Sequence, residues 1–256
     1  VVAATLKKNS RRAEAFALSQ LEIANNLEIA ARKQETLAKQ EAVRLSRQTR
    51  EAIDTMLTGI GDALDAFPGM QDARRRLLER AAQDYTRLAK VDSADTDLQA
   101  EAARSLRRLA DVYAKLNSVD LARTALIQAD ETLQRQLKSS GHKPQFELEL
   151  GITNTKRGLL EAAAGKTNLA ISFFQTAITS LQEIVKSHPD EIDYQDALGT
   201  ALIGLGQVEQ NVSQRPAADR HLQQARSLFQ ALRIRYPESS RVLTATTHSE
   251  KAYGVY

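Results

Sequence analysis

Small and large apolar residues recur along the chain with a period of 48 residues. Two of the recurring columns, one small and one large, are Ala122, Ala170, Ala218 and Leu126, Phe174, Leu222. A fixed period in this range indicates a stacked-repeat architecture, in which each unit buries its apolar face only against its neighbours. We therefore expect an array of stacked repeats.

Helix-breaking residues recur in register with the apolar columns, as His188-Pro189-Asp190 and Tyr236-Pro237-Glu238 show. Between them the chain is rich in Ala, Leu, Gln, Glu and Arg, which favour helices, while aromatic residues make up only 5%. The pattern predicts an all-α fold, an α-solenoid of antiparallel helix hairpins. The predicted helices span residues 70–91, 96–116, 119–138, 144–164, 167–187, 191–212 and 216–235, and a last one begins near Ser239.

The first part of the chain lacks the repeat. No Pro occurs between Ser10 and Ala66, so one long helix or two helices in line are expected. A seven-residue apolar line through residues 16–37 ends at Arg44, so the coiled-coil pattern is partial. We predict an Ala-rich helical stalk over residues 1–66, and the partial pattern leaves open whether it associates weakly with copies of itself. Residues 67–256 form the repeat array, whose last unit is incomplete.

The N-terminus begins with an apolar run, Val1 to Leu6, followed by four basic residues before any acidic one. This order is typical of the end of a membrane span and its basic flank. An ordinary solvated helix start explains it equally well. No window in the chain itself has the roughly 18 to 20 apolar residues of a span, so membrane association is expected only through an upstream segment.

Within each unit the spacing of core residues resembles the tetratricopeptide repeat family, whose period is about 34 residues. In the first full unit the matching residues are Leu106, Leu109-Ala110, Tyr113, Asn117, Ala122, Leu126 and Ala129. The longer period here implies longer helices. The resemblance implies stacked hairpins whose first helices line a concave surface that binds peptides or proteins.

A narrower resemblance covers residues 44–90, through Pro68-Gly69-Met70-Gln71, the run 74–79 and Asp84-Tyr85. This region is similar to the one that precedes the repeats in planctomycete-type transmembrane serine/threonine kinases. The resemblance implies a kinase domain, a membrane span, a stalk and then the repeats, which would lie outside the cytoplasm. The basic N-terminal flank favours the cytoplasmic side instead, so the side of the membrane stays open.

The sequence motifs that usually mark a catalytic or phosphate-binding site are missing, although Asp and Glu are plentiful. The chain contains no Cys, no Gly-rich phosphate loop, no His-Arg-Asp loop, no Asp-Phe-Gly and no Gly-x-Ser-x-Gly. The four histidines are scattered without metal-ligand spacing, and a formal charge of +3 is spread along mixed helix faces. We expect no catalysis, no cofactor, no metal and no nucleic-acid partner.

The concave surface is the candidate site. In the repeat register, the positions one, four and eight residues after Ala103, Gly151 and Gly199 should face it. These nine positions are Arg104, Arg107, Asp111, Ile152, Thr155, Leu159, Thr200, Ile203 and Gln207. The hypothesis is a protein or peptide ligand held by the apolar members, with the arginines binding its acidic groups.

Two alternatives remain beside this hypothesis. The inner face could be an unoccupied, solvated surface. The chain could also be a free-standing structural adaptor, in which the stalk over residues 1–66 holds protomers together and no kinase is attached.

Overall fold

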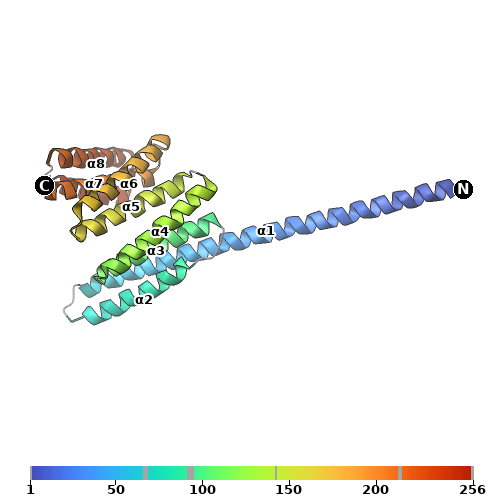
Figure 1. The fold of residues 1–256 in the computed structure, drawn as a ribbon, viewed down its shortest axis with the longest axis horizontal. Helices are drawn as coiled ribbons and strands as arrows, with labels where there is room; N and C mark the ends of the chain where they lie inside the picture. The colour runs from blue at the N-terminus through green and yellow to red at the C-terminus, as the bar shows by residue number, and fades with distance from the viewer. Residues whose placement is uncertain (1, 66–68, 91–94, 142, 213–214, 255–256) are drawn as a thin grey trace. The chain divides into compact units, whose positions relative to one another are not determined.

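The computed structural model describes residues 2–65, 69–90, 95–141, 143–212 and 215–254, and every regular element in these ranges is a helix (Figure 1). The helices are α1 (Val2–Asp65), α2 (Gln71–Ala89), α3 (Thr96–Lys115), α4 (Val119–Ser140), α5 (Pro144–Ala163), α6 (Thr167–Ser187), α7 (Ile192–Asn211), α8 (Arg215–Arg235) and α9 (Ser240–Tyr253). The all-α helical repeat is confirmed, and the predicted helix ends in the array differ from these by at most two residues.

Pro68 lies outside the described residues. No described helix is both long and apolar enough to cross a membrane.

The chain divides into two compact units, Val1–Gln48 and Thr49–Tyr256, so the division falls inside α1. The sequence suggested a boundary near residue 66, where the helix breaks. The structure places the last turns of α1 in the second unit, because the side chain of Ile53 is buried in a cluster with Leu78 and Leu106. Arg50 also donates a hydrogen bond to Glu101 on α3, at 3.2 Å.

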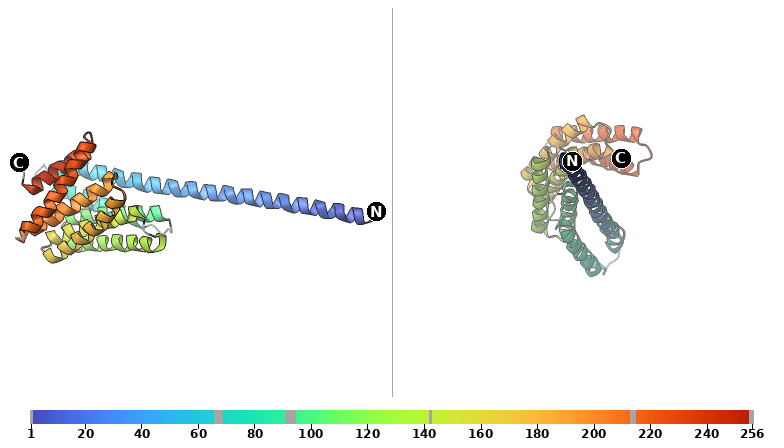
Figure 2. Two further views of the ribbon diagram at one scale, coloured as in Figure 1. Left: turned by 90° about the horizontal axis from the view of Figure 1, so that it is seen from above. Right: turned by 90° about the vertical axis from the view of Figure 1, so that its right-hand side faces the viewer.

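In the second unit, consecutive helices form antiparallel hairpins. α3 packs on α4, α5 on α6 and α7 on α8, and α9 packs on α8 (Figures 1 and 2). The first helices of successive hairpins also contact each other, α3 with α5, α5 with α7 and α7 with α9. The helices α3, α5, α7 and α9 therefore form one continuous layer, which we call the inner layer.

Tight turns join the helices within two of the hairpins. Asn117 and Gly165 occupy the same repeat column and both have positive φ, 58° and 74°. The next amides donate back to carbonyls of the preceding helix, Ser118 to Tyr113 at 2.8 Å and Lys166 to Glu161 at 2.8 Å. A residue in the left-handed conformation at the C-terminal end of a helix lets the following amides bind carbonyl oxygens that would otherwise lack a hydrogen-bond donor. It reverses the chain within three residues and sets the hairpin geometry.

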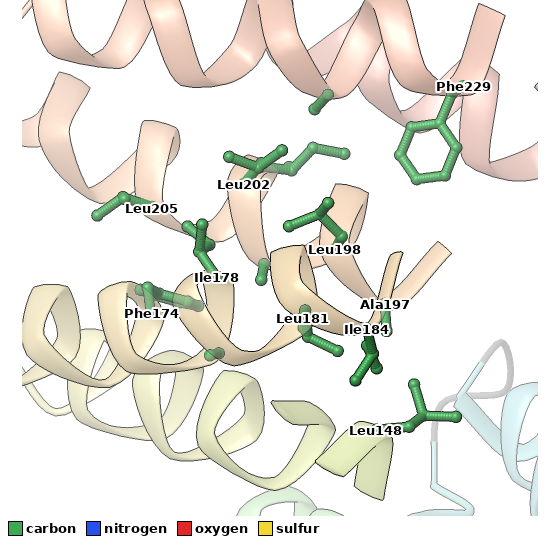
Figure 3. Close-up of a cluster of buried hydrophobic side chains, with 14 of the residues drawn as sticks. Leu148, Phe174, Ile178, Leu181, Ile184, Ala197, Leu198, Leu202, Leu205 and Phe229 are labelled. Carbon is green, nitrogen blue, oxygen red and sulfur yellow. The ribbon is translucent and has the colours of Figure 1, made fainter. Parts of the chain in front are cut away.

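The core is built from the small and large columns predicted from the sequence. Figure 3 shows Phe174, Ile178 and Leu181 facing Leu198, Leu202 and Leu205 across two hairpins. Phe174 is fully buried because two glycines make room for its ring. A Cβ atom at Gly158 would lie 2.9 Å from that ring, and one at Gly204 would lie 2.5 Å from it. Close helix approach therefore depends on these small residues.

Candidate functional site

The inner layer carries a groove of about 540 Å³ formed mainly by α7 and α9. It is lined by Leu159, Asp196, Thr200, Ile203, Gly204, Gln207, Phe229, Ser240, Arg241, Thr244, Ala245 and His248. Four of the nine predicted site residues, Leu159, Thr200, Ile203 and Gln207, line this groove together. The repeat register therefore brings them onto one surface.

The floor of the groove is apolar. Ile203 on α7 is buried, and Phe229 reaches the floor from α8. Leu159, at the C-terminal end of α5, leaves 43% of its surface exposed. Two small residues, Gly204 and Ala245, add little side-chain bulk to the lining. This floor can remove an apolar side chain of a ligand from water, which is worth roughly 1.5–3 kcal/mol for a fully buried Leu or Phe.

The rim of the groove is polar and carries one cluster of charges. The guanidinium of Arg241 on α9 pairs with two carboxylates of α7, with Nη2 2.5 Å from Asp196 Oδ2. Asp196 lines the groove with Arg241, and Asp193 reaches this cluster from the preceding turn of α7, just outside the lining. Burial lowers the pKa of Arg241, but the hydrogen bonds that its guanidinium donates to Asp196 and Asp193, together with their negative charges, outweigh this and raise it. The cluster contains two negative charges and one positive charge, so it is negative overall.

Other rim side chains offer neutral hydrogen-bonding groups. Gln207 and His248 are exposed, and within the described residues their side chains have no hydrogen-bond partner. Thr200 is exposed beside them. An apolar floor with a few polar groups around it is the usual composition of a ligand groove.

Arg104 and Arg107 do not line this groove. Their side chains are only 18% and 11% exposed, and both pair with Glu149 on α5, at 2.6 Å from Arg104 Nε and 2.5 Å from Arg107 Nη1. Arg104 also pairs with Glu101, which accepts from Arg50. We call these five residues, Arg50, Glu101, Arg104, Arg107 and Glu149, the ionic cluster. Each of its arginines is paired with at least one buried carboxylate, and Arg50 also pairs with Asp54 at 3.4 Å.

Electrostatics in the ionic cluster favour the charged forms. Burial alone would raise the pKa of Glu149, but Arg107 and Arg104 outweigh it and hold this pKa below its ordinary value. A buried carboxylate paired in this way is stable only while both partners remain charged. The ionic cluster is therefore a closed internal network, with little capacity left for an acidic ligand.

The remaining three predicted residues, Asp111, Thr155 and Ile152, belong neither to the groove lining nor to the ionic cluster. Asp111 is paired with Lys156 of the next hairpin, at 2.8 and 2.9 Å. Thr155 is buried and donates to the carbonyl oxygen of Gly151 at 2.9 Å. Ile152 packs partly buried against the core. The structure therefore brings together the C-terminal half of the predicted site and separates it from the N-terminal half.

Sequence analysis missed the contribution of α9 to the groove. Arg241, Thr244 and His248 all come from this helix. His248 follows Thr200 by one full period of 48, so the repeat register contained the signal. The site predicted from the sequence included only the complete repeat units. The column of Thr200 was not extended into the last, incomplete unit, where His248 occupies it. Phe229 could not be found this way, because it reaches the groove from a second helix.

Comparison with known proteins identifies no family. No family model matches the chain, and no curated protein matches it. Among solved structures, BtubC (BKLC) from P. vanneervenii resembles it with a TM-score of 0.44 and 13% sequence identity. That match covers 75% of this chain and 91% of the other. A likeness at this level supports no functional argument.

Proposed function

We propose that this chain is a non-catalytic binding module that holds a peptide segment of a partner protein in the groove between α7 and α9. The observation that supports the proposal is the groove itself, a volume of about 540 Å³ with an apolar floor and a polar rim. Binding grooves for small ligands and peptide anchors span roughly 300–1,000 Å³. The size suits one or two anchoring side chains of a longer segment.

A helical segment suits such a groove better than an isolated small molecule. The groove is lined along successive turns of two neighbouring helices, from Asp196 to Gln207 on α7 and from Ser240 to His248 on α9. A helix can place apolar side chains on the floor at successive turns while its polar face meets the rim. The partner is therefore a protein segment rather than a metabolite.

The wider context of the module is also part of the proposal. The tetratricopeptide-like spacing, with residues such as Leu109-Ala110 and Tyr113, supports a repeat of that type with lengthened helices. The region around Met70-Gln71 supports its place as the sensing part of a membrane-bound serine/threonine kinase. In that layout the array binds its ligand on the extracytoplasmic side and is tethered through an upstream segment.

A selection experiment tests the groove. A random peptide display library would be selected on the whole chain and on a variant with Thr200→Trp and Gln207→Trp, whose bulky rings fill the groove. A matched control, Thr179→Trp with Gln182→Trp, places the same rings on exposed positions of α6. The proposal predicts binders that the control retains and the groove variant loses. Binders retained equally by all three chains would contradict it.

A second candidate function is a structural adaptor that joins protomers through the first unit. One observation favours it. Several large aliphatic side chains of α1 are at least half exposed: Leu18, Leu21, Ile23, Leu27, Ile29, Leu37 and Leu45. Isolated helices in water are marginally stable, and packing against a partner is what usually stabilises them. A second copy of the chain would supply such packing.

Light scattering distinguishes the adaptor function. The double variant Leu21→Gln and Leu27→Gln in the full chain should convert an oligomer to a monomer. Ile234→Gln on α8 is the control, because Ile234 is 84% exposed but lies outside the first unit. The adaptor function is wrong if the unaltered chain is monomeric or if the double variant keeps the mass of the unaltered chain.

A further inference from the structure

We infer that the segment bound in the groove combines an apolar anchor with a neighbouring Lys or Arg, so that the ligand is apolar and basic rather than acidic. This inference rests on the proposed function and specifies the chemistry of its partner. It reverses the ligand charge expected from Arg104 and Arg107.

The rim charges lead to this conclusion. Asp193 and Asp196 face a single guanidinium, that of Arg241, which binds both of them. The side chain of Arg241 is 53% exposed, but its guanidinium already donates to both carboxylates, so an acidic ligand would have to compete with Asp193 and Asp196 for it. The carboxylate of Asp193 is 60% exposed, so a cation of the ligand can reach it without breaking the existing pair. An incoming lysine or arginine would complete the charge balance of the cluster.

The arginines elsewhere on the inner layer do not change this balance. Arg104 and Arg107 are engaged by buried Glu149 and Glu101 at the other end of the layer. An acidic residue of a ligand at the groove would meet Asp196, and like charges in contact disfavour the complex. The negative charge of the rim therefore favours the binding of basic segments and disfavours the binding of acidic ones.

The floor defines the second half of the ligand. Leu159 and Ala245 lie in the same groove as Asp196, and Ile203 and Phe229 complete its apolar surface. A Leu, Ile or Phe of the ligand can bury its side chain there. The anchor supplies affinity and the adjacent cation supplies selectivity, because rim charges act more on specificity and association rate than on affinity.

A peptide series tests the inference directly. Three helical peptides would share two leucines on one face and differ at one neighbouring position, which is Lys, Gln or Glu. Fluorescence anisotropy with the whole chain should give the order Lys, Gln, Glu from tight to weak. A difference of about tenfold in Kd between Lys and Glu, equivalent to about 1.4 kcal/mol, is expected, and added salt should reduce it.

Variants of the rim complete the test. Asp193→Asn should reduce the preference for the Lys peptide, and Asp193→Lys should reverse it in favour of the Glu peptide. The control is Asp190→Asn, since Asp190 is also an exposed carboxylate paired with one arginine, but that arginine is Arg235, which does not line the groove, whereas Asp193 pairs with Arg241 of the groove lining. This control should leave the preference unchanged.

The outcomes separate the inference from the proposed function. Equal binding of all three peptides, lost in the variant with Thr200→Trp and Gln207→Trp, would overturn the charge preference and leave the groove proposal standing. No saturable binding of any peptide would overturn both. A preference for the Glu peptide by the unaltered chain would also overturn the inference.

Discussion

The two halves of the inner layer share one scaffold but present different surfaces. The column that holds Glu101 and Glu149 in the first half holds Ala197 in the second, and the column of Arg107 becomes Ile203. In the first half, these charges pair with each other across α3 and α5 and close the surface. In the second half, the apolar replacements leave an open groove. A constant helix framework can therefore carry a stabilising network at one end and a binding site at the other.

The two halves of the inner layer are also stabilised by different interactions. The first half depends on paired charges that are removed from water, and removing one partner leaves the other buried without compensation. The second half depends on close approach of helices over glycines, and added volume there forces the helices apart. A different kind of substitution therefore destabilises each half: removal of a charged partner in the first half, and added side-chain volume in the second.

The largest expected effect comes from breaking the ionic cluster. Glu149→Gln leaves the largely buried Arg107 without its carboxylate and leaves Arg104 with Glu101 alone. We expect a loss of about 3–5 kcal/mol in the free energy of unfolding, measured by urea denaturation, as found for buried pairs that lose one member.

The control for this prediction is Glu183→Gln, which neutralises an exposed carboxylate on α6. It should change stability by less than about 0.5 kcal/mol, as is usual at the surface. Equal stability of the two variants would show that the ionic cluster contributes nothing to the first half.

A smaller effect is expected from overpacking the second half. In Gly206→Leu, the new Cβ would lie 2.6 Å from Leu222 Cγ and 3.3 Å from the backbone oxygen of Ala218, so α7 and α8 must separate. Urea denaturation should show a loss of about 1–3 kcal/mol. The substitution Gly165→Asn is the control, because Gly165 is in a turn with open space around it and Asn117 already occupies the same column. A Gly206→Leu chain as stable as this control would contradict the helix register.

Acid should destabilise the first half through Glu149. Because the folded state holds the pKa of Glu149 below its ordinary value of 4.5, its contribution to stability is complete above that value. The contribution is lost as the pH falls through the lower folded pKa. Unfolding free energies measured across this acidic range should fall more steeply for the unaltered chain than for Glu149→Gln. Parallel curves would show that Glu149 has no depressed pKa.

The smallest stability effect is expected from the groove itself. Thr200 and Gln207 are exposed, so Thr200→Trp with Gln207→Trp should change the free energy of unfolding by less than about 0.5 kcal/mol while abolishing peptide binding. A thermal melt checks the first statement. A large loss of stability would mean that these positions belong to the core and not to a groove.

The helices of the array could be predicted closely because each is marked by local signals. Pro144 starts α5, and Asp95 caps α3 by accepting from the amides of Asp97 and Leu98. Glycine and proline near the ends mark the stops. These signals act within a few residues, so a single sequence contains them.

The site could be predicted only in part, because its character depends on contacts between units. Thr200, Ile203 and Gln207, which the repeat register assigned to one surface, line the same groove. The register treated Arg104 and Arg107 as available cations, since their pairing with Glu149 joins residues more than forty positions apart. The boundary within α1 was missed for a similar reason, because the burial of Ile53 depends on other helices.

The most direct test of the account is hydrogen exchange, measured by mass spectrometry, on the whole chain with and without the leucine-lysine peptide. Binding in the groove predicts added protection over α7 and α9, around Thr200 and His248, and none over the N-terminal half of α3. Protection centred on Arg104 and Arg107, or in the first unit alone, would contradict the division between a closed ionic half and an open binding half.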